Sequence, residues 1–217
     1  MNVYDTVIFD LDGTLLNTVD DLAASVNYAL ENNGMPRRTV DEVRRFVGNG
    51  IRKLMERAVP AGTPSEIIDK AFSDFGEHYG SHCAVLTRPY DGINEMLDRM
   101  NSLGLKLAIV SNKADFAVKE LREIFFGETI ITAIGERKGV SRKPAPDSVF
   151  AAVRELGSDL SKAVYVGDSD VDIMTARNAG IPCISVSWGF KGRRFLEEHG
   201  AETIIDYPTD IFSYICK

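Results

Sequence analysis

Cysteine is scarce in this chain of 217 residues, and long apolar runs are absent. The three cysteines, Cys83, Cys183 and Cys216, are odd in number and far apart in the sequence. They support neither a disulfide framework nor a zinc site, because both need paired or closely spaced cysteines. The apolar residues 7–9 are flanked by aspartates, which argues against a signal peptide or a membrane span at that point. We therefore expect a cytoplasmic protein with free thiols and no membrane partner.

The chain also has fewer basic than acidic residues. It contains 25 Lys and Arg residues and 32 Asp and Glu residues, which gives a net charge of −7. Proteins that bind nucleic-acid duplexes carry a face rich in Lys and Arg, whereas the basic stretches here are short and interrupted. We therefore expect no nucleic-acid partner. The contents of 44% hydrophobic and 26% charged residues are typical of globular domains. The length suits one domain with a smaller one inserted, and we expect a monomer or a weak dimer.

Short β-branched runs alternate along the chain with longer stretches of helical spacing. This alternation predicts an α/β fold in which a doubly wound, Rossmann-like parallel sheet has helices on both faces. Apolar residues recur at helical spacing in residues 92–103 and again in residues 147–156, so both stretches are predicted to be helices. The predicted strands are residues 6–9, 106–110, 129–134, 163–166, 183–186 and 203–205.

One long region breaks this alternation. From about residue 18 to residue 87 only helical patterns occur, separated by turn sequences such as Gly48-Asn49-Gly50. Because the first strand precedes this region and the second follows it, we predict an all-helical cap domain at residues 17–87. The core domain would then comprise residues 1–16 and 88–217. An insertion that leaves from the carboxyl end of a strand lies near the edge where parallel sheets bind ligands.

Polar residues follow several of the predicted strands. Taken singly, each polar segment would fit a helix cap or a tight turn. Together they would bring carboxylates, a hydroxyl group and a lysine to one edge of the sheet, which predicts a metal-assisted phosphoryl-transfer site. The segments are Asp10-Leu11-Asp12-Gly13-Thr14, Ser111-Asn112-Lys113, Lys143-Pro144-Ala145-Pro146-Asp147 and Gly167-Asp168-Ser169-Asp170-Val171-Asp172.

The predicted metal is Mg2+, because clustered carboxylates repel one another unless they are paired or bind a cation. Mg2+ prefers hard oxygen ligands, takes one or two protein carboxylates and keeps positions open for phosphate and water. Lys143 and the amides of a helix expected to begin near Asn112 would suit a phosphate dianion. The expected partner is therefore a small phosphorylated metabolite.

These four segments resemble, in order and composition, the four motifs of the haloacid dehalogenase-like hydrolase superfamily, which has a helical cap between the first two. Within it the chain is most similar to the phosphoglycolate phosphatase group, at residues 47–51, 111–113 and 186–190. Two departures occur. Asn17-Thr18 stands where the family usually has Asp-Ser, and Ser111 stands where it often has Thr. The second change keeps the hydroxyl group, whereas the first lies at the expected hinge, where its effect on cap closure stays open.

The resemblance implies a Mg2+-dependent hydrolase of phosphoric monoesters, with 2-phosphoglycolate as the favoured substrate. It implies that Asp10 is the nucleophile that forms an aspartyl-phosphate, and that Asp12 is the general acid and base. The metal ligands would be Asp10, the backbone carbonyl of Asp12 and Asp168, with support from Asp172. The implied groups that bind the phosphate belong to Ser111, Lys143, Gly13, Thr14 and Asn112.

The motifs leave the leaving group of the substrate open. In the cap, the turn at Gly48 and the neighbouring Arg52 could contact a small anion, although a plain loop with an exposed arginine fits equally well. Pyrophosphatase, nucleotidase and sugar-phosphate phosphatase or mutase activities share the core motifs. A mutase usually has a histidine early in the cap, which this chain lacks. A dehalogenase would not be expected to keep Asp12, and a phospho-receiver signalling module would not carry its acceptor Asp on the first strand.

Overall fold

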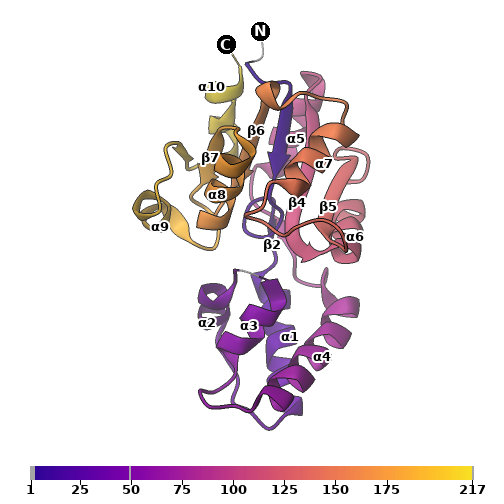
Figure 1. Ribbon diagram of the computed structural model, residues 1–217, viewed down its shortest axis with the longest axis vertical. Coiled ribbons are helices and arrows are strands. Elements are labelled where there is room, and N and C mark those ends of the chain that lie inside the picture. Colours follow the sequence, from indigo (N-terminus) through magenta and orange to yellow (C-terminus); the bar gives the residue numbers. More distant parts are fainter. Residues whose placement is uncertain (1–2, 49, 217) are drawn as a thin grey trace. The chain divides into compact units, whose positions relative to one another are not determined.

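The computed structural model describes residues 3–48 and 50–216, which form two compact units (Figure 1). An α/β unit comprises the chain up to Leu16 and from Pro89 onward, and a helical unit comprises Asn17–Arg88. The second junction lies one residue beyond the predicted cap boundary at residue 87. At the junctions the chain forms two short strands that the sequence pattern did not indicate, β2 (Leu16–Asn17) and β3 (Arg88–Pro89), and these strands pair.

The α/β unit is built on a six-stranded sheet with the strand order β5-β4-β1-β6-β7-β8. All neighbouring strands are parallel. Strand β1 lies inside the sheet, between β4 and β6, and its side chains are buried. Short apolar strands of this kind are typical of a sheet that is covered on both faces. The strands are β1 (Thr6–Phe9), β4 (Lys106–Ala114), β5 (Thr132–Glu136), β6 (Ala163–Gly167), β7 (Cys183–Val186) and β8 (Ile204–Ile205).

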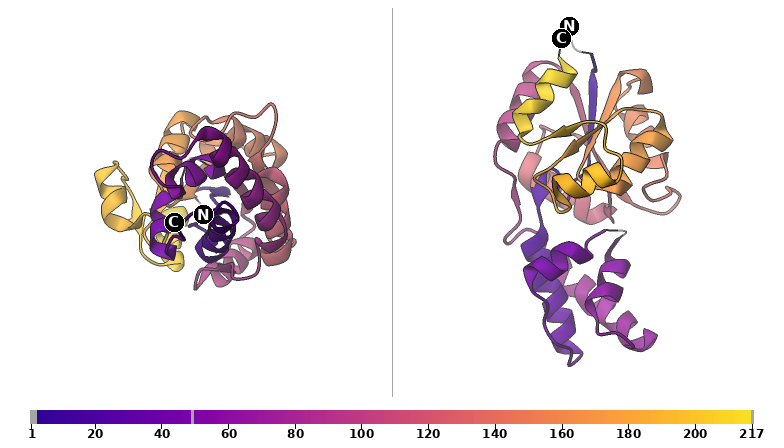
Figure 2. Two further views of the ribbon diagram at one scale, coloured as in Figure 1. Left: turned by 90° about the horizontal axis from the view of Figure 1, so that it is seen from below. Right: turned by 90° about the vertical axis from the view of Figure 1, so that its left-hand side faces the viewer.

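Helices cover both faces of this sheet (Figure 2). On one face, α7 (Asp147–Glu155) and α8 (Asp170–Ala179) contact each other and the central strands through a buried apolar cluster. On the opposite face lie α5 (Ile93–Ser102) and α10 (Phe212–Ile215). The described part of the unit also contains α6 (Asp115–Phe126) and α9 (Gly192–Glu198). The predicted doubly wound α/β fold is confirmed.

Each predicted strand is present, but two of them differ clearly from their predicted bounds. Strand β5 begins three residues later than predicted and ends at Glu136, and β4 is longer than predicted. It extends to Ala114, with a shift of register between Val110 and Ala114, and α6 begins only at Asp115. The prediction that a helix begins near Asn112 is therefore wrong. Pairing of Ala114 with Glu136 of β5 keeps this segment extended beyond its apolar run. Residues 111–113 consequently do not offer the amides of a helix N-terminus.

The described residues of the helical unit form α1 (Val19–Asn32), α2 (Val40–Phe46), α3 (Gly50–Ala58) and α4 (Ser65–His82). Helix α1 packs against α2 and α4. Helix α2 begins with a capping box, in which Thr39 Oγ1 accepts from the N–H of Glu42 and the Glu42 carboxylate accepts from the N–H of Thr39. Among the described residues, no helix is both long enough and apolar enough to cross a membrane.

A buried carboxylate joins the two ends of the helical unit. Asp21, in the first turn of α1, accepts hydrogen bonds from the N–H groups of Leu86 (2.9 Å to Oδ1) and Thr87 (2.8 Å to Oδ2). Hydrogen bonds to an ionised acceptor are stronger than neutral ones. Asp21 therefore fixes the segment that follows α4 against the start of α1.

We predict that Asp21→Ala lowers the free energy of unfolding of the helical unit by about 2–4 kcal/mol, because a charged acceptor is lost and the buried N–H of Thr87 loses its partner. Urea denaturation followed by far-UV circular dichroism measures this change. Asp20→Ala is the matched control, since Asp20 lies in the same helical turn, and it should cost less than about 1 kcal/mol. Equal losses in the two variants would contradict a specific role for Asp21.

Candidate active site

Three carboxylates meet at the carboxyl edge of the sheet. Asp10 follows β1 directly, Asp168 follows β6, and Asp172 lies in the first turn of α8. One oxygen atom from each lies within 4.8 Å of the other two. The carboxyl ends of neighbouring parallel strands share one edge, so residues far apart in the sequence meet there. Asp10, Asp168 and Asp172 are thus brought together as the sequence predicted.

The local sequence holds each of these side chains in place. The backbone N–H of Asp10 donates to the carbonyl of Val166 at 2.9 Å, which continues the pairing of β1 with β6 by one residue. Asp172 Oδ2 accepts from the N–H (3.1 Å) and the hydroxyl (2.6 Å) of Ser169 and so closes a capping box at the start of α8. Gly167 is required beside it, because a Cβ there would lie 2.3 Å from Asp172 Cγ.

Lys143 is a buried ammonium group that joins two of the carboxylates. Its Nζ lies 2.8 Å from Asp10 Oδ1, 2.8 Å from Asp172 Oδ1 and 3.0 Å from the hydroxyl oxygen of Tyr165. An ammonium group has three protons to donate, and these three acceptors use all of them. In this state Lys143 therefore holds the carboxylates, and its predicted contact with the phosphate stays a prediction.

Asn112 holds the backbone of Lys143. Its Nδ2 donates to the Lys143 carbonyl at 3.0 Å, and its Oδ1 accepts from the Lys143 N–H at 2.8 Å. Both polar atoms of the side chain are therefore used to place the lysine. The implied contact of Asn112 with the substrate stays a prediction, and its observed role is to support Lys143.

Asp12 forms a second ion pair at this edge. Lys113 Nζ donates to Asp12 Oδ1 at 2.6 Å, and the side chain of the lysine is only 4% exposed. The backbone N–H of Lys113 donates to the hydroxyl oxygen of Ser111 at 3.2 Å. Strand β4 thus contributes both the hydroxyl group predicted for phosphate binding and the cation that faces Asp12.

Two glycines surround the third carboxylate, Asp168. A Cβ on Gly13 would lie 2.4 Å from Asp168 Oδ2, and one on Gly189 would lie 2.3 Å from Asp168 Cβ. The N–H of Phe190 donates to Asp168 Oδ2 at 2.7 Å. The chain therefore packs closely around Asp168, and a glycine is needed at position 13 because a larger residue would clash with this carboxylate. The N–H of Gly13 donates to the carbonyl of Leu16 within the turn, so its implied contact with phosphate stays a prediction.

Thr14 belongs to the same turn. Its side chain is buried, and its hydroxyl oxygen has no hydrogen-bond partner among the residues that the structure describes. Its carbonyl accepts from the indole N–H of Trp188 at 3.0 Å. Thr14 borders a small internal space that is otherwise lined by apolar residues such as Phe9 and Ile93. A contact between Thr14 and phosphate stays a prediction.

Two acids of this site, Asp10 and Asp168, have raised pKa values. Burial, together with repulsion from Asp172 and Asp12, raises the pKa of Asp10 to about 7, although Lys143 acts in the opposite direction. Burial and the neighbouring carboxylates also raise the pKa of Asp168 well above its usual value. The pKa of Lys143 is raised despite its burial, because Asp10 and Asp172 favour its charged form. If all three were ionised, the clustered carboxylates would carry more negative charge than Lys143 neutralises.

This donor set fits a divalent cation that prefers hard oxygen ligands. Carboxylate oxygens of Asp10, Asp168 and Asp172 converge within 4.8 Å. Burial, together with repulsion from neighbouring carboxylates, raises the pKa of Asp10 and of Asp168. A bound Mg2+ would relieve that repulsion and would favour the ionised carboxylates. Thiol and imidazole groups are absent from this described cluster, which disfavours zinc or copper.

The cap residues predicted to contact substrate lie in the helical unit. Arg52 of α3 pairs with Asp69 of α4 and with Glu56, and its guanidinium group lies 5.7 Å from the ring centroid of Phe72. The carbonyl of Gly48 accepts from Arg57. Asn49 lies outside the described residues. The contacts of Arg52 and Gly48 are thus within their own unit, and their contact with substrate stays a prediction.

Tyr165 was not singled out from the sequence. Its hydroxyl group lies 3.1 Å from Asp172 Oδ1 and 3.3 Å from the carbonyl of Val110, beneath Lys143. Its position in an otherwise apolar buried strand was an available signal, because a buried tyrosine hydroxyl needs a polar partner. The backbone N–H of Phe190 was also missed, and no side-chain pattern could have indicated it.

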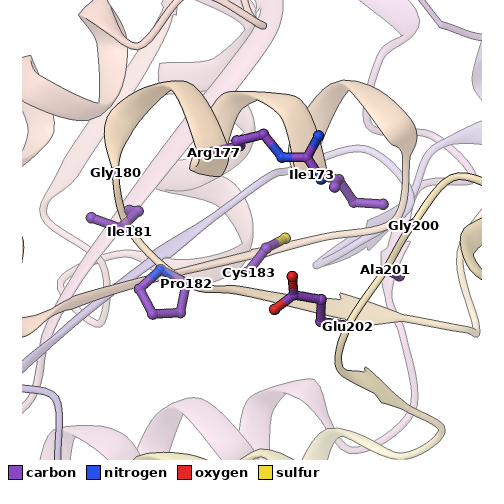
Figure 3. A pocket seen from close by; sticks show the side chains of 9 residues that line it. All are labelled: Ile173, Arg177, Gly180, Ile181, Pro182, Cys183, Gly200, Ala201 and Glu202. Atoms are coloured by element: carbon purple, nitrogen blue, oxygen red, sulfur yellow. The ribbon is translucent and has the colours of Figure 1, made fainter.

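A separate hollow of about 340 Å³ lies between the end of α8 and the start of β7 (Figure 3). It is at the amino end of β7, whereas the carboxylates follow the carboxyl ends of β1 and β6. None of the predicted site residues lines it. Its lining includes Ile173, Arg177, Cys183 and Glu202.

Comparison with known proteins agrees with this site. Residues 7–186 match the family model described as haloacid dehalogenase-like hydrolase. An N-acetylmuramic acid 6-phosphate phosphatase of Pseudomonas aeruginosa is 31% identical over 211 residues, covering 96% of this chain and 93% of that protein. A phosphoglycolate phosphatase of Caulobacter vibrioides is 34% identical over 210 residues, covering 95% of this chain and 88% of that protein.

A solved structure shares the whole fold. The protein is from Lactobacillus delbrueckii subsp. bulgaricus and carries a provisional assignment as a phosphoglycolate phosphatase. It superposes with a TM-score of 0.94 at 34% identity, and both chains are covered completely. The order of the motifs, the clustered carboxylates and these matches agree, and the chain belongs to the haloacid dehalogenase-like hydrolase family.

Proposed function

We propose that this hydrolase is a Mg2+-dependent phosphatase that cleaves small phosphate monoesters, with 2-phosphoglycolate as the favoured substrate, through an aspartyl-phosphate on Asp10. The observation that carries the proposal is the position of Asp10. Its carboxylate lies at the sheet edge, is held by Lys143 at 2.8 Å, and faces Asp168 and Asp172 within 4.8 Å. A nucleophile that is held in one orientation can attack phosphorus from a single geometry.

In the first step a carboxylate oxygen of Asp10 attacks phosphorus. The bond between phosphorus and the ester oxygen breaks, and its electron pair goes to the ester oxygen, which takes a proton from Asp12. Lys143 keeps Asp10 oriented toward the substrate, and the hydroxyl group of Ser111 is available to the transferring oxygens. The products are an alcohol and an acyl phosphate on Asp10.

In the second step water attacks the same phosphorus. Asp12, now ionised, takes a proton from that water while the new bond forms and the bond to Asp10 breaks. Inorganic phosphate is released, and Asp10 returns as a carboxylate. Asp12 thus donates a proton in the first step and accepts one in the second, so both steps depend on its position.

The residues that would hold the metal are Asp10 and Asp168, with the backbone carbonyl of Asp12, and Asp172 would support them through Lys143 and Ser169. Bound Mg2+ supplies neutralisation of the negative charges that would otherwise keep nucleophile and phosphate apart. The residues of the chain orient the nucleophile and position the proton donor.

Two relatives point to different leaving groups. The name of the Caulobacter vibrioides protein specifies phosphoglycolate, whereas that of the Pseudomonas aeruginosa protein specifies N-acetylmuramic acid 6-phosphate. The identities are close, at 34% and 31%, so both esters are candidates. We favour 2-phosphoglycolate because several of the matching relatives carry the same name.

A panel of phosphate esters tests the substrate. With Mg2+ present, we expect kcat/KM for 2-phosphoglycolate to exceed that for pyrophosphate, a nucleoside monophosphate and a hexose phosphate by at least about tenfold, which corresponds to about 1.4 kcal/mol of differential transition-state binding. N-acetylmuramic acid 6-phosphate belongs in the same panel. If it gives the highest kcat/KM, the second candidate replaces the first, and release of phosphate from none of the compounds would refute a phosphatase.

Asp10→Asn tests the nucleophile. We expect kcat to fall by about 10³-fold or more, because an amide cannot form the acyl phosphate. Circular dichroism should show that the fold is retained. Asp98→Asn is the matched control, since Asp98 is an exposed carboxylate on α5 with the same formal charge, and its turnover should be unchanged. Unchanged turnover in Asp10→Asn would rule out the mechanism.

The raised pKa of Asp10, about 7, predicts how metal binding depends on pH. This pKa exceeds the ordinary value of 3.8, so the metal-free folded state binds the proton more tightly than the unfolded state does and loses stability as pH rises from about 4 to about 7. Mg2+ competes with that proton. We therefore expect Mg2+ to raise the Tm more at pH 8 than at pH 5.5, as measured by differential scanning fluorimetry. An equal shift at both values, or a full shift in Asp168→Asn, would contradict this assignment.

A further inference from the structure

Lys113 is a buried cation without an assigned role in the reaction. Its side chain is 4% exposed, and its Nζ donates to Asp12 Oδ1 at 2.6 Å across 101 positions of sequence. Withdrawing an ammonium group from water is costly unless a close opposite charge compensates for it. Asp12 provides such a charge, so the conformations of the two side chains depend on each other.

The backbone around Lys113 is fixed as well. Its N–H donates to Ser111 Oγ, and its carbonyl lies 2.7 Å from the place where a Cβ of Gly135 would stand. The N–H of Gly135 in turn donates to Asp115 Oδ1 at 3.0 Å. Lys113 thus lies at the end of β4 where the register with β5 shifts, close against Gly135 of β5, and its side chain reaches Asp12.

We infer that Lys113 is a positioning residue, which fixes the Asp12 carboxyl group for proton exchange with the leaving group and then with water. The inference rests on the proposed function, because it concerns the acid and base of that reaction. Lys113 itself forms no bond to the reacting atoms. Its effect is to restrict the rotation of Asp12, so that one orientation serves both steps.

Two other roles for Lys113 make different predictions. If its ammonium group bound the substrate phosphate, its loss would raise KM for every ester. If the ion pair only stabilised the fold, its loss would reduce the amount of active protein and would affect all esters equally. A positioning role differs from both, because it matters only when the leaving group needs a proton.

Leaving-group dependence therefore separates these roles. An alkyl alkoxide needs a proton as it departs, whereas p-nitrophenolate is a stable anion that departs without one. The ratio kcat/KM reports the steps up to departure of the leaving group, and general acid catalysis is worth about 10²–10⁴-fold. We expect Lys113→Met to lower kcat/KM for the best alkyl ester of the panel by about 100-fold, and to lower it for p-nitrophenyl phosphate by less than about threefold.

Comparison of two esters on one preparation removes the effect of any unfolded fraction, because that fraction cancels in the ratio. Lys113→Arg keeps a charged donor and should recover most of the alkyl activity. Lys119→Met is the control for loss of one positive charge, since Lys119 forms an exposed pair with Asp115 at the start of α6, and it should leave the ratio unchanged.

Three outcomes would overturn the inference. They are an equal fall of kcat/KM for both esters, a rise in KM alone for both, and failure of Lys113→Arg to recover more alkyl activity than Lys113→Met. If the unmodified enzyme hydrolysed neither ester in the presence of Mg2+, the proposed function itself would fail, and this result needs no variant to be recognised.

Discussion

The repulsion among carboxylates at one edge of the sheet is the constraint on which the rest of the site depends. Asp10, Asp168 and Asp172 approach within 4.8 Å, and burial raises the pKa of Asp10 and of Asp168. Lys143 offsets part of this charge through two contacts of 2.8 Å. The negative charge that Lys143 does not offset fits a divalent cation. Repulsion that destabilises the metal-free site therefore also favours binding of a metal ion, and with it phosphate.

Several neighbouring residues hold the charged side chains of the site in position. Asn112 uses both polar atoms to place the backbone of Lys143, and Tyr165 supports its ammonium group from below. Gly13 and Gly189 leave room for Asp168, where any larger side chain would clash. These residues are not expected to take part in bond making. They fix the groups that do, which is the condition for electrostatic catalysis with little reorganisation.

The division into two units places the clustered carboxylates in one of them, the α/β unit. The core carboxylates and their lysines belong to the α/β unit, and two relatives with different substrate names each match nearly the whole of this chain. Asp21 closes the helical unit at its junctions, so that this unit is held together by its own hydrogen bonds. Arg52 forms ion pairs with Asp69 and Glu56 in that unit.

The sequence alone was sufficient to predict the parallel sheet and the meeting of three carboxylates at its carboxyl edge. Alternating periods define strands and helices, and the carboxyl ends of parallel strands must meet at one edge, so Asp10, Asp168 and Asp172 could be brought together without coordinates. The end of β4 could not be predicted in this way, because pairing with β5 extends it beyond its apolar run. The partners of Lys113, Asn112 and Tyr165 were likewise decided by tertiary structure. The sequence specifies the chemical type of each side chain. The partner of that side chain depends on which distant segment packs within about 3 Å of it.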